Sequence, residues 1–489
     1  MNNSQIIERS HLIATKPVLM PDKDQLEAIR NEWIFKTPLS KDLTERARRV
    51  LPNGTQHTLP LTNPYPFFMN KGSGSKLWDV DGNTFTDFIL SGGAIVLGHN
   101  DPILIQNITE LLQHRTHFHG HFDELEIKAA EEVIAFFPSI EKVRFTSSGS
   151  EANTAAVKIA RAATGKKKII KFMGNYHGWH NEFLIDVEVP GSGKIISQGI
   201  NDEVLNETIL VPQNNLEALE LAFKQAQNHG GVAAVIIEPF GAESGLMPYL
   251  DDFHPQALKL THQYGALYIL DEVVTGFRMG LGGAQKFLGI NPDLTTLGKA
   301  MMNGFPSCGA VGGKKDLMDI VDVGVPMKQP YTFVSGTLSG NTLSMAACYH
   351  VVSTLRKTQK LALAESMTIK LVHKLNQLFT ATDSDFFAYH FGSILRVEMT
   401  APHAVAINSE QAIMDVLSRR KALSDYAMIV SSAGVLSRMG RDFVSAAHTE
   451  ADLDQYVLAY EKLLHVLGKR TGFYLPKMRS YTLAETFLS

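Results

Sequence analysis

Residues 143–163 read V-R-F-T-S-S-G-S-E-A-N-T-A-A-V-K-I-A-R-A-A. The residues up to Thr146 predict a short strand, and the segment from Ala152 to Ala163 predicts a helix. A polar turn with one glycine joins them, and backbone N–H groups at such a helix start attract anions. The N–H groups of Gly149 and Ser150, with the hydroxyls of Ser148 and Ser150, would point at a phosphate. Ordinary helix capping explains the same residues, so the motif alone leaves both interpretations open.

The alternation of strand and helix continues along the chain. Strand-like runs occur at 143–146, 168–172, 232–237 and 267–270, and helical stretches include 152–163 and 255–264. This spacing predicts βαβ units and a mostly parallel sheet, and therefore an α/β fold.

Segments outside this region predict a second structural unit. Two alternating runs flank Asp81-Gly82, which indicates a β-hairpin, and residues 24–35 have a helical pattern. After about residue 346, helices near 410–423 and 451–467 surround strands at 394–400. We expect an N-terminal arm (1–45), an N-terminal part of a small domain (46–100), a large ligand-binding domain (101–345) and a smaller α+β C-terminal domain (346–489).

Length and composition limit the possible function. A chain of 489 residues, 44% of them hydrophobic, is too long for one compact core. The net charge of -4 and the lack of a long basic run argue against nucleic acid as a ligand. With only Cys308 and Cys348, no targeting segment and no run of 18 apolar residues, the sequence predicts a soluble cytoplasmic protein without contact to a membrane.

Two further motifs lie where predicted strands end. Y-H-G-W-H at 176–180 places Tyr176 where open α/β sheets bind ligands, and its ring can stack on a flat molecule. In A-L-Y-I-L-D-E-V at 266–273, Asp271 ends an apolar strand and needs a cationic partner, because an unpaired buried charge is costly. A protonated pyridine nitrogen would supply this cation. An ordinary Arg or Lys side chain is the alternative partner. Tyr176 taken alone is equally compatible with a core or loop aromatic.

The last two motifs supply a nucleophile and a second polar loop. In D-L-T-T-L-G-K at 293–299, Lys299 closes an apolar run, and a lysine in apolar surroundings has a lowered pKa and attacks aldehydes. A surface lysine at a strand end is the alternative. In S-G-T-L-S-G-N at 335–341, Thr337 would bind a second edge of a phosphate, or the loop would only turn and cap a helix. One ligand with a phosphate, a flat pyridinium ring and an aldehyde explains all five motifs.

The order S-G-S-E-A, Y-H-G, D-E-V, a lone Lys and G-T-L-S-G-N resembles the class III aminotransferases, which are fold-type I enzymes dependent on pyridoxal 5'-phosphate. The resemblance is strongest to the branch of glutamate-1-semialdehyde 2,1-aminomutases. It extends over roughly residues 45 to 465, through L-W-D-V-D-G-N, V-L-G-H-N, D-E-V-V-T-G-F-R and F-V-S-A-A-H-T. It implies a large domain with a mostly parallel seven-stranded sheet, and a smaller α+β domain at the C-terminus.

The resemblance also implies roles for individual residues. Lys299 matches the lysine that holds the cofactor as a Schiff base and moves protons, Asp271 the partner of the pyridine nitrogen, and Tyr176 the stacking aromatic. The other matches to cofactor-binding positions are Ser148, Gly149, Ser150, His177, Val273 beneath the ring, and Glu243 near the phenolic oxygen or the substrate. Thr337 matches a threonine that reaches the phosphate of the neighbouring subunit, which implies a homodimer with shared active sites.

The substrate side departs from the aminomutases. Where they have G-V-N-S-P-V-R, this chain has N-G-T-Q-H-T-L-P at 53–60, so that His57 and Pro60 replace a serine and an arginine. Gly92 replaces a pocket tryptophan, and Gly440 replaces a glutamate. Arg438 and Arg441 are gained, and we hypothesise that they anchor a carboxylate, since Arg binds carboxylates bidentately. Two solvent-facing arginines are the alternative.

These observations predict an aminotransferase that moves an amino group between a small amino compound, such as an amino acid, and a keto or aldehyde acceptor through a pyridoxamine intermediate. Intramolecular amine transfer by an aminomutase, transfer to carrier-bound or secondary-metabolite intermediates, and a scaffold without turnover are the alternatives. A histidine cluster at 114, 117, 119 and 121 would bind an anion or make activity pH-sensitive. No cysteine or second cluster completes a metal site there, so no metal is expected.

Overall fold

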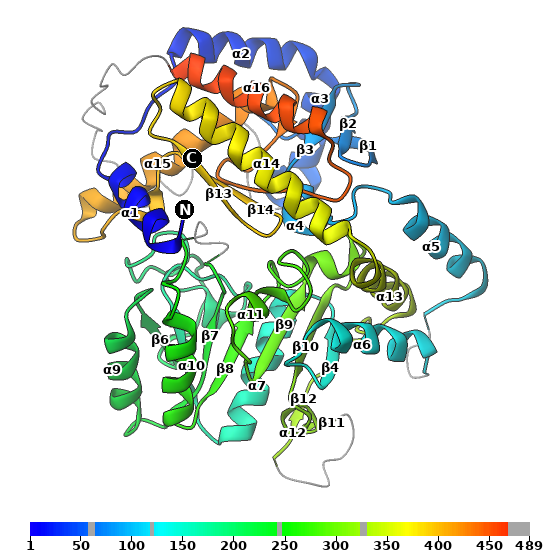
Figure 1. Ribbon diagram of the computed structural model, residues 1–489, viewed down its shortest axis with the longest axis vertical. Coiled ribbons are helices and arrows are strands. Elements are labelled where there is room, and N and C mark those ends of the chain that lie inside the picture. Colours follow the sequence, from blue (N-terminus) through cyan, green and yellow to red (C-terminus); the bar gives the residue numbers. More distant parts are fainter. Residues whose placement is uncertain (57–63, 118–121, 242–246, 323–329, 468–489) are drawn as a thin grey trace.

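The largest element of the fold is a seven-stranded sheet with the strand order β4-β10-β9-β8-β7-β5-β6 (Figure 1). The computed structural model describes residues 1–56, 64–117, 122–241, 247–322 and 330–467. The strands are β4 (Lys142–Thr146), β5 (Lys168–Phe172), β6 (Thr208–Val211), β7 (Val232–Ile237), β8 (Leu267–Asp271), β9 (Leu294–Gly298) and β10 (Gly309–Gly313). Strand β10 runs antiparallel to β4 and β9, and the other neighbouring strands pair in parallel, so the mostly parallel sheet is confirmed.

Helices bury both faces of this sheet. Ile169, Ile236 and Ile269 pack with α7 (Gly149–Thr164). Their sequence neighbours Ile170 and Ile237 pack on the other face with α9 (Leu216–Ala226) and α10 (Phe253–Gln263). Because both faces are covered, a central strand such as β7, V-A-A-V-I-I, is apolar without alternation. The other helices of this part are α5 (Pro102–His114), α6 (Glu124–Phe136), α8 (Asp202–Leu205), α9 (Leu216–Ala226), α10 (Phe253–Gln263), α11 (Gly283–Phe287), α12 (Lys315–Met318) and α13 (Thr342–Lys357).

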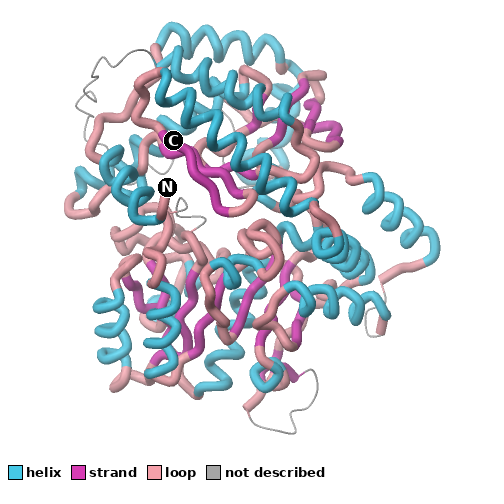
Figure 2. Tube along the Cα trace, in the orientation of Figure 1, coloured by secondary structure: helices cyan, strands magenta, loops and turns pink. Residues whose placement is uncertain are grey.

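Two small sheets form the second part of the molecule (Figure 2). One contains β1 (Met69–Ser73), β2 (Lys76–Asp79), β3 (Thr84–Asp87) and β15 (Val435–Leu436); the other contains β13 (Phe387–Phe391), β14 (Ile394–Glu398) and β16 (Arg441–Phe443). The hairpin predicted at Asp81-Gly82 is confirmed by the antiparallel pairing of β2 with β3. Helices α14 (Lys360–Ala381), α15 (Glu410–Ser431) and α16 (Glu450–Leu467) pack over these sheets.

The pairing of β3 with β15 joins segments that are far apart in the sequence. Helix α13 spans the predicted boundary at residue 345, and its buried face packs against α5 and α6. The domain boundaries themselves stay predictions.

The remaining elements are short. Strands β11 (Val321–Asp322) and β12 (Thr332–Phe333) pair with each other. The short helical turns are α4 (Leu90–Gly93), η1 (Pro52–Gly54), η2 (Asn181–Phe183), η3 (Lys299–Met302) and η4 (Pro402–Ala404).

Three helices precede the first sheet: α1 (Asn3–Ala14), α2 (Lys23–Lys36) and α3 (Pro38–Val50). Helix α1 bridges the two parts of the molecule, because Nδ2 of Asn3 donates to the carbonyl of Tyr249 (3.0 Å) and Nδ1 of His11 lies 3.1 Å from the carbonyl of Ala404. The N-terminal segment is therefore part of the folded core. Within the described ranges, no helix is both long enough and apolar enough to cross a bilayer.

Candidate active site

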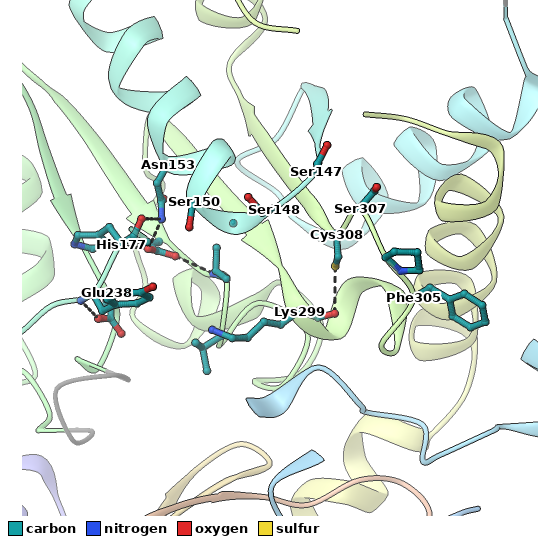
Figure 3. Close-up of a pocket in the computed structure, with 17 residues that line it drawn as sticks. Ser147, Ser148, Ser150, Asn153, His177, Glu238, Lys299, Phe305, Ser307 and Cys308 are labelled. Atoms are coloured by element: carbon teal, nitrogen blue, oxygen red, sulfur yellow. Dashed lines mark hydrogen bonds and ion pairs between the residues drawn. The ribbon is translucent and has the colours of Figure 1, made fainter. Parts of the chain in front are cut away.

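A pocket of about 340 Å³ opens where several strands of the large sheet end (Figure 3). The carboxyl ends of parallel strands are the usual ligand-binding edge of an open α/β sheet. Eight of the predicted residues line it together, and these are Ser148, Gly149, Ser150, Tyr176, His177, Asp271, Val273 and Lys299. The described lining also includes Ser147, Asn153, Gly178, Glu238, Val274 and the turn from Phe305 to Cys308.

The turn before α7 forms one wall of the pocket. Ser148 caps the helix, since its side chain accepts the N–H of Glu151 (3.2 Å). Two glycines allow close packing along this wall. A Cβ at Gly149 would lie 2.8 Å from Cγ1 of Val273, and a Cβ at Gly178 would lie 2.3 Å from Oγ of Ser150. A side chain at either position would collide with these neighbours, so glycine is required for the packing around the helix start, where backbone N–H groups attract anions.

Asp271 lies at the end of β8 with 5% of its surface exposed. Its Oδ2 accepts from Nδ2 of Asn153 (2.8 Å) and from Nδ1 of His177 (2.7 Å). Burial lowers the pKa of His177, against the opposing effect of Asp271, so the ring is a neutral donor with its proton on Nδ1. Among the described residues, no lysine or arginine forms an ion pair with Asp271. The carboxylate is therefore positioned by neutral groups and still lacks the cation that its burial requires.

Tyr176 is positioned by a second buried carboxylate. Glu238 directly follows β7, and its Oε1 accepts the backbone N–H of Tyr176 (2.7 Å). The N–H of Glu238 donates in turn to Oδ1 of Asn175 (2.9 Å). Lys171 is fully buried nearby, and burial lowers its pKa to about 8 even though Asp186 and Glu238 act in the opposite direction. These contacts fix the backbone that carries the Tyr176 ring.

Lys299 follows β9 directly and extends into the pocket from the side opposite Ser148 and Ser150 (Figure 3). Its φ of 42° lies in the left-handed region, which costs a residue other than glycine about 1–3 kcal/mol. Sγ of Cys308 donates to the Lys299 carbonyl (3.2 Å) and so helps to hold this backbone. Strain of this kind is maintained by surrounding contacts and is typical of functional residues.

Other predicted residues lie outside this pocket. Thr337 does not line it; its carbonyl lies 3.1 Å from Nε2 of His117. Glu243 and His57 fall outside the described residues, as do Pro60 and two members of the histidine cluster at 119 and 121. Across the described ranges, no three His, Cys, Asp or Glu side chains are grouped to hold a metal ion.

The turn that contains Gly92 has positive φ values, as Lys299 does. Residues 90–93 have φ values of 47°, 54°, 69° and 92°, which make a left-handed turn. Asp87 stabilises it by accepting the N–H groups of Ile89 (2.8 Å) and Leu90 (3.1 Å), and Nε of Arg278 donates to the Gly93 carbonyl (2.9 Å). The left-handed backbone at position 92 itself favours glycine.

Each of the two glycines of the substrate side lies beside an arginine side chain. Nη1 of Arg438 lies 3.6 Å from the point where a Cβ would stand at Gly92, and a Cβ at Gly440 would lie 2.6 Å from Nη1 of Arg396. Arg396 faces Arg441 across β14 and β16, and both are buried. Arg396 pairs with Glu398 (3.2 Å). None of the predicted residues Gly92, Arg438 and Arg441 lines the pocket around Lys299, although Leu90 and Val274 share one apolar cluster that connects the two regions.

Comparison with known proteins identifies the family. The family model of aminotransferase class-III matches residues 60–447, which is well over half of the chain. The chain belongs to the class-III aminotransferase family. This enzyme is 35% identical over 426 residues to the glutamate-1-semialdehyde 2,1-aminomutase of Caldicellulosiruptor saccharolyticus, covering 85% of this chain and 96% of that protein.

Solved structures of aminotransferases have the same fold. An omega-transaminase from Sphaerobacter thermophilus superposes with a TM-score of 0.79 and 28% identity, covering 88% of this chain and 97% of that one. A transaminase with PLP bound superposes with a TM-score of 0.78 and 28% identity, covering 88% and 98%. The expected fold-type I architecture is thereby confirmed.

The cofactor of this class-III aminotransferase is pyridoxal 5'-phosphate, and the pocket residues fit it. The start of α7 at Ser148–Ser150 lines the pocket, and its backbone N–H groups would attract a phosphate. Asp271 needs a cation, which the pyridine nitrogen would supply, and Lys299 provides a primary amine for the aldehyde. Four of the five sequence motifs thus contribute to one cavity, whereas Thr337 of the fifth motif does not line it.

Sequence reasoning missed Asn153, Glu238 and Arg396. Asn153 lies one helical turn after Gly149 and so faces the same side of α7. Glu238 ends a fully buried strand, as Asp271 does, so the argument used for Asp271 applies to it as well. Arg396 lies inside an apolar strand, and only the packing of Gly440 against its guanidinium reveals its place.

Proposed function

We propose that this enzyme is an aminotransferase that moves an amino group from a small amino compound, such as an amino acid, to a keto or aldehyde acceptor. The observation that carries the proposal is the group of arginines beside Gly92 and Gly440. At these positions the aminomutase pattern has a tryptophan and a glutamate. In this chain both positions are glycine, with the guanidinium of Arg438 beside Gly92 and that of Arg396, which pairs with Glu398, beside Gly440.

The chain's own residues divide the work in the pocket. When bound, pyridoxal phosphate supplies an electron sink for the electrons that a proton at the substrate Cα leaves behind. Asp271, oriented by Asn153 and His177, would balance the charge of the ring nitrogen. Tyr176 would stack on the ring, and the helix start at Ser148–Ser150 would hold the phosphate. The Lys299 amine would anchor the cofactor and, once released, would accept the proton from the substrate Cα.

Arg438 and Arg441 are proposed to bind a carboxylate of the substrate. The 7% exposure of Arg441 argues against the solvent-facing alternative for that residue, and Arg438 is half-buried. A guanidinium can bind a carboxylate bidentately, so a substrate carboxylate would add to the contacts that Arg438 and Arg441 already make.

A 2,1-aminomutase is the second candidate, and the similarity to curated aminomutases favours it. In that reaction the amine returns to a neighbouring carbon of the same molecule and no acceptor is consumed. Transfer to a carrier-bound compound is a third possibility. The guanidinium of Arg438 lies beside Gly92. The space that the glycine leaves is therefore partly occupied, which argues against a long acyl chain there.

We further propose a homodimer in the cytoplasm, with Thr337 acting at the partner's phosphate. In support, α5 and α6 present exposed apolar side chains, among them Ile103 (66%), Leu112 (60%) and Ile127 (61%). Exposed apolar surface of this kind commonly marks a protein interface. Size-exclusion chromatography with light scattering tests the dimer.

Incubation of the cofactor-loaded enzyme with single amino compounds, without an acceptor, tests the proposed reaction. A transaminase converts one equivalent of donor, loses the visible absorbance of its cofactor and then stops until a keto acid or an aldehyde is added. Continuous conversion of glutamate-1-semialdehyde with no added acceptor would support the mutase instead.

A further inference from the structure

The backbone of residues 93–98 continues directly from the left-handed turn on the substrate side, and two side chains of the large part hold it. Arg278 belongs to the loop that follows Asp271 at the end of β8. Asn303 caps the η3 turn that begins at Lys299. Both side chains are buried. The two loops that carry the groups for the cofactor therefore also hold this segment.

Arg278 binds this segment and the small part at the same time. Its Nε donates to the Gly93 carbonyl (2.9 Å) and its Nη2 to the Ile95 carbonyl (2.7 Å). Its Nη1 donates to Oγ of Ser393 (3.1 Å) and to the Val444 carbonyl (3.2 Å). All four acceptors are neutral, and a fully buried charge with neutral partners is costly. Apolar packing would join these segments more cheaply, but it would not fix their position with directional bonds.

Asn303 holds the same segment from the side of Lys299. Its Oδ1 accepts the N–H groups of Val96 (2.8 Å) and Leu97 (2.8 Å), and its Nδ2 donates to the Gly98 carbonyl (3.1 Å). The φ of Asn303 is 47°, a left-handed conformation that asparagine adopts more readily than most residues. One amide side chain thus binds three consecutive residues of the segment.

The other end of the turn is held within the small part. Asp87, which ends β3, accepts the N–H groups of Ile89 and Leu90. The bonds from Arg278 and Asn303 instead tie the turn to the loops of the cofactor pocket. This distance matters for chemistry, because a displacement of about 1 Å between reacting groups can cost about 100-fold in rate.

We propose that Arg278 and Asn303 are positioning residues, which hold the Gly92 turn at the distance from the cofactor pocket that substrate binding requires. This role rests on the proposed function, in which a substrate carboxylate lies beside Gly92. The loops after β8 and β9 then set the substrate side as well as the cofactor side of the active site.

Hydrogen exchange in Asn303→Gly tests the contact itself. The variant removes the side chain, and glycine adopts a positive φ freely. The amides of Val96 and Leu97 lose their acceptor, so they should exchange about tenfold faster in the cofactor-loaded enzyme, read by mass spectrometry. Asn303→Asp retains an oxygen acceptor and should exchange at close to the rate of the unchanged enzyme. No substrate is needed, so this readout is independent of the proposed function.

The reaction of the bound cofactor with two small amines measures the effect on the site. Hydroxylamine reports access to the cofactor aldehyde, whereas aminooxyacetate reacts at the same atom and also carries a carboxylate for the substrate side. In Asn303→Gly and in Arg278→Lys, the rate with aminooxyacetate should fall about tenfold and the rate with hydroxylamine should stay unchanged. The control Asn376→Ala loses two bonds to the backbone of Ala388 within the small part and should alter neither rate.

Unchanged exchange at the two amides in Asn303→Gly would overturn the proposal, and so would faster exchange with an unaltered rate for aminooxyacetate. Equal slowing of both probes, or the same slowing in Asn376→Ala, would also overturn it, because either result indicates a general loss of structure. Failure of the proposed function would be seen in a different variant. A rate with aminooxyacetate that is unaltered in Arg441→Ala would contradict the carboxylate anchor at Arg441 alone.

Discussion

Replacement of His177 by leucine probes how the pocket keeps Asp271 in place. The change removes the Nδ1–H that donates to Oδ2 of Asp271 at 2.7 Å, while the backbone carbonyl that accepts from Asn153 remains. Asn153 is then the one described side chain that still donates to this carboxylate. A buried carboxylate that has lost a donor can turn away from the position that faces the cofactor ring.

The expected size of the effect follows from the type of bond. A hydrogen bond to a charged group contributes about 1.5–3 kcal/mol. If the whole loss falls on cofactor binding, the dissociation constant of pyridoxal phosphate rises by a factor of about 10 to 100. His177→Asn retains an amide N–H close to the position of Nδ1 and should recover most of the affinity.

Equilibrium dialysis against pyridoxal phosphate, read by the visible absorbance of the bound cofactor, measures this effect. His180→Leu is the matched control, because His180 lies in the same motif but is about half exposed and pairs with Glu182 (2.6 Å). The reasoning would be refuted by a dissociation constant for His177→Leu equal to that of His180→Leu. It would also fail if His177→Asn were as weak a binder as His177→Leu.

Three further outcomes are expected. Gly178→Ala forces a Cβ to within 2.3 Å of Oγ of Ser150 at a φ of 103°, and should weaken cofactor binding at least about tenfold at a cost of about 1–3 kcal/mol; Gly193→Ala, at a φ of 65° with open space, should leave that binding unchanged in the same dialysis assay. Arg441→Ala should raise the KM for a carboxylate-bearing amino donor about tenfold and leave the KM for the matching amine without a carboxylate unaltered; an unaltered KM for both would exclude Arg441 as an anchor. Burial lowers the folded-state pKa of His403 to about 4, below its unfolded value of 6.5, so its contribution is fully present above pH 6.5 and is lost as the pH falls toward 4. At pH 5 His403→Leu should therefore be more stable than the parent by about 2 kcal/mol in urea unfolding, with little difference at pH 7.5, and an equal effect at both pH values would contradict this.

The cofactor pocket was predictable because its parts follow strand ends. A polar residue that ends an apolar run, such as Asp271 or Lys299, is costly in an ordinary core, and parallel strands bring such residues to one edge. The same argument would have located Glu238. Strand β10 was harder to predict from the sequence, because its residues G-A-V-G-G include three glycines, which are uncommon in strands. Their small size is required by close packing, and a Cβ at Gly309 would lie 2.2 Å from the Ser148 carbonyl.

From the sequence alone, the substrate side could be recognised only by the positions at which it differs from the aminomutase pattern. Gly92 and Gly440 were identified as losses of side chains, but the sequence does not show what lies beside them. The structure places guanidinium groups of Arg438 and Arg396 there, through a left-handed turn at residues 90–93 and the pairing of β14 with β16. Such contacts between distant segments depend on tertiary packing, which motif spacing does not encode.

Chemical trapping of the cofactor tests the central claim most directly, namely that Lys299 is its anchor in this pocket. The loaded enzyme is reduced with borohydride, digested, and mapped by mass spectrometry. We predict that the pyridoxyl group is found on the peptide that contains Lys299 and that Lys299→Ala carries no such group. A label on another lysine, such as the buried Lys171, with Lys299 unmodified, would contradict the account.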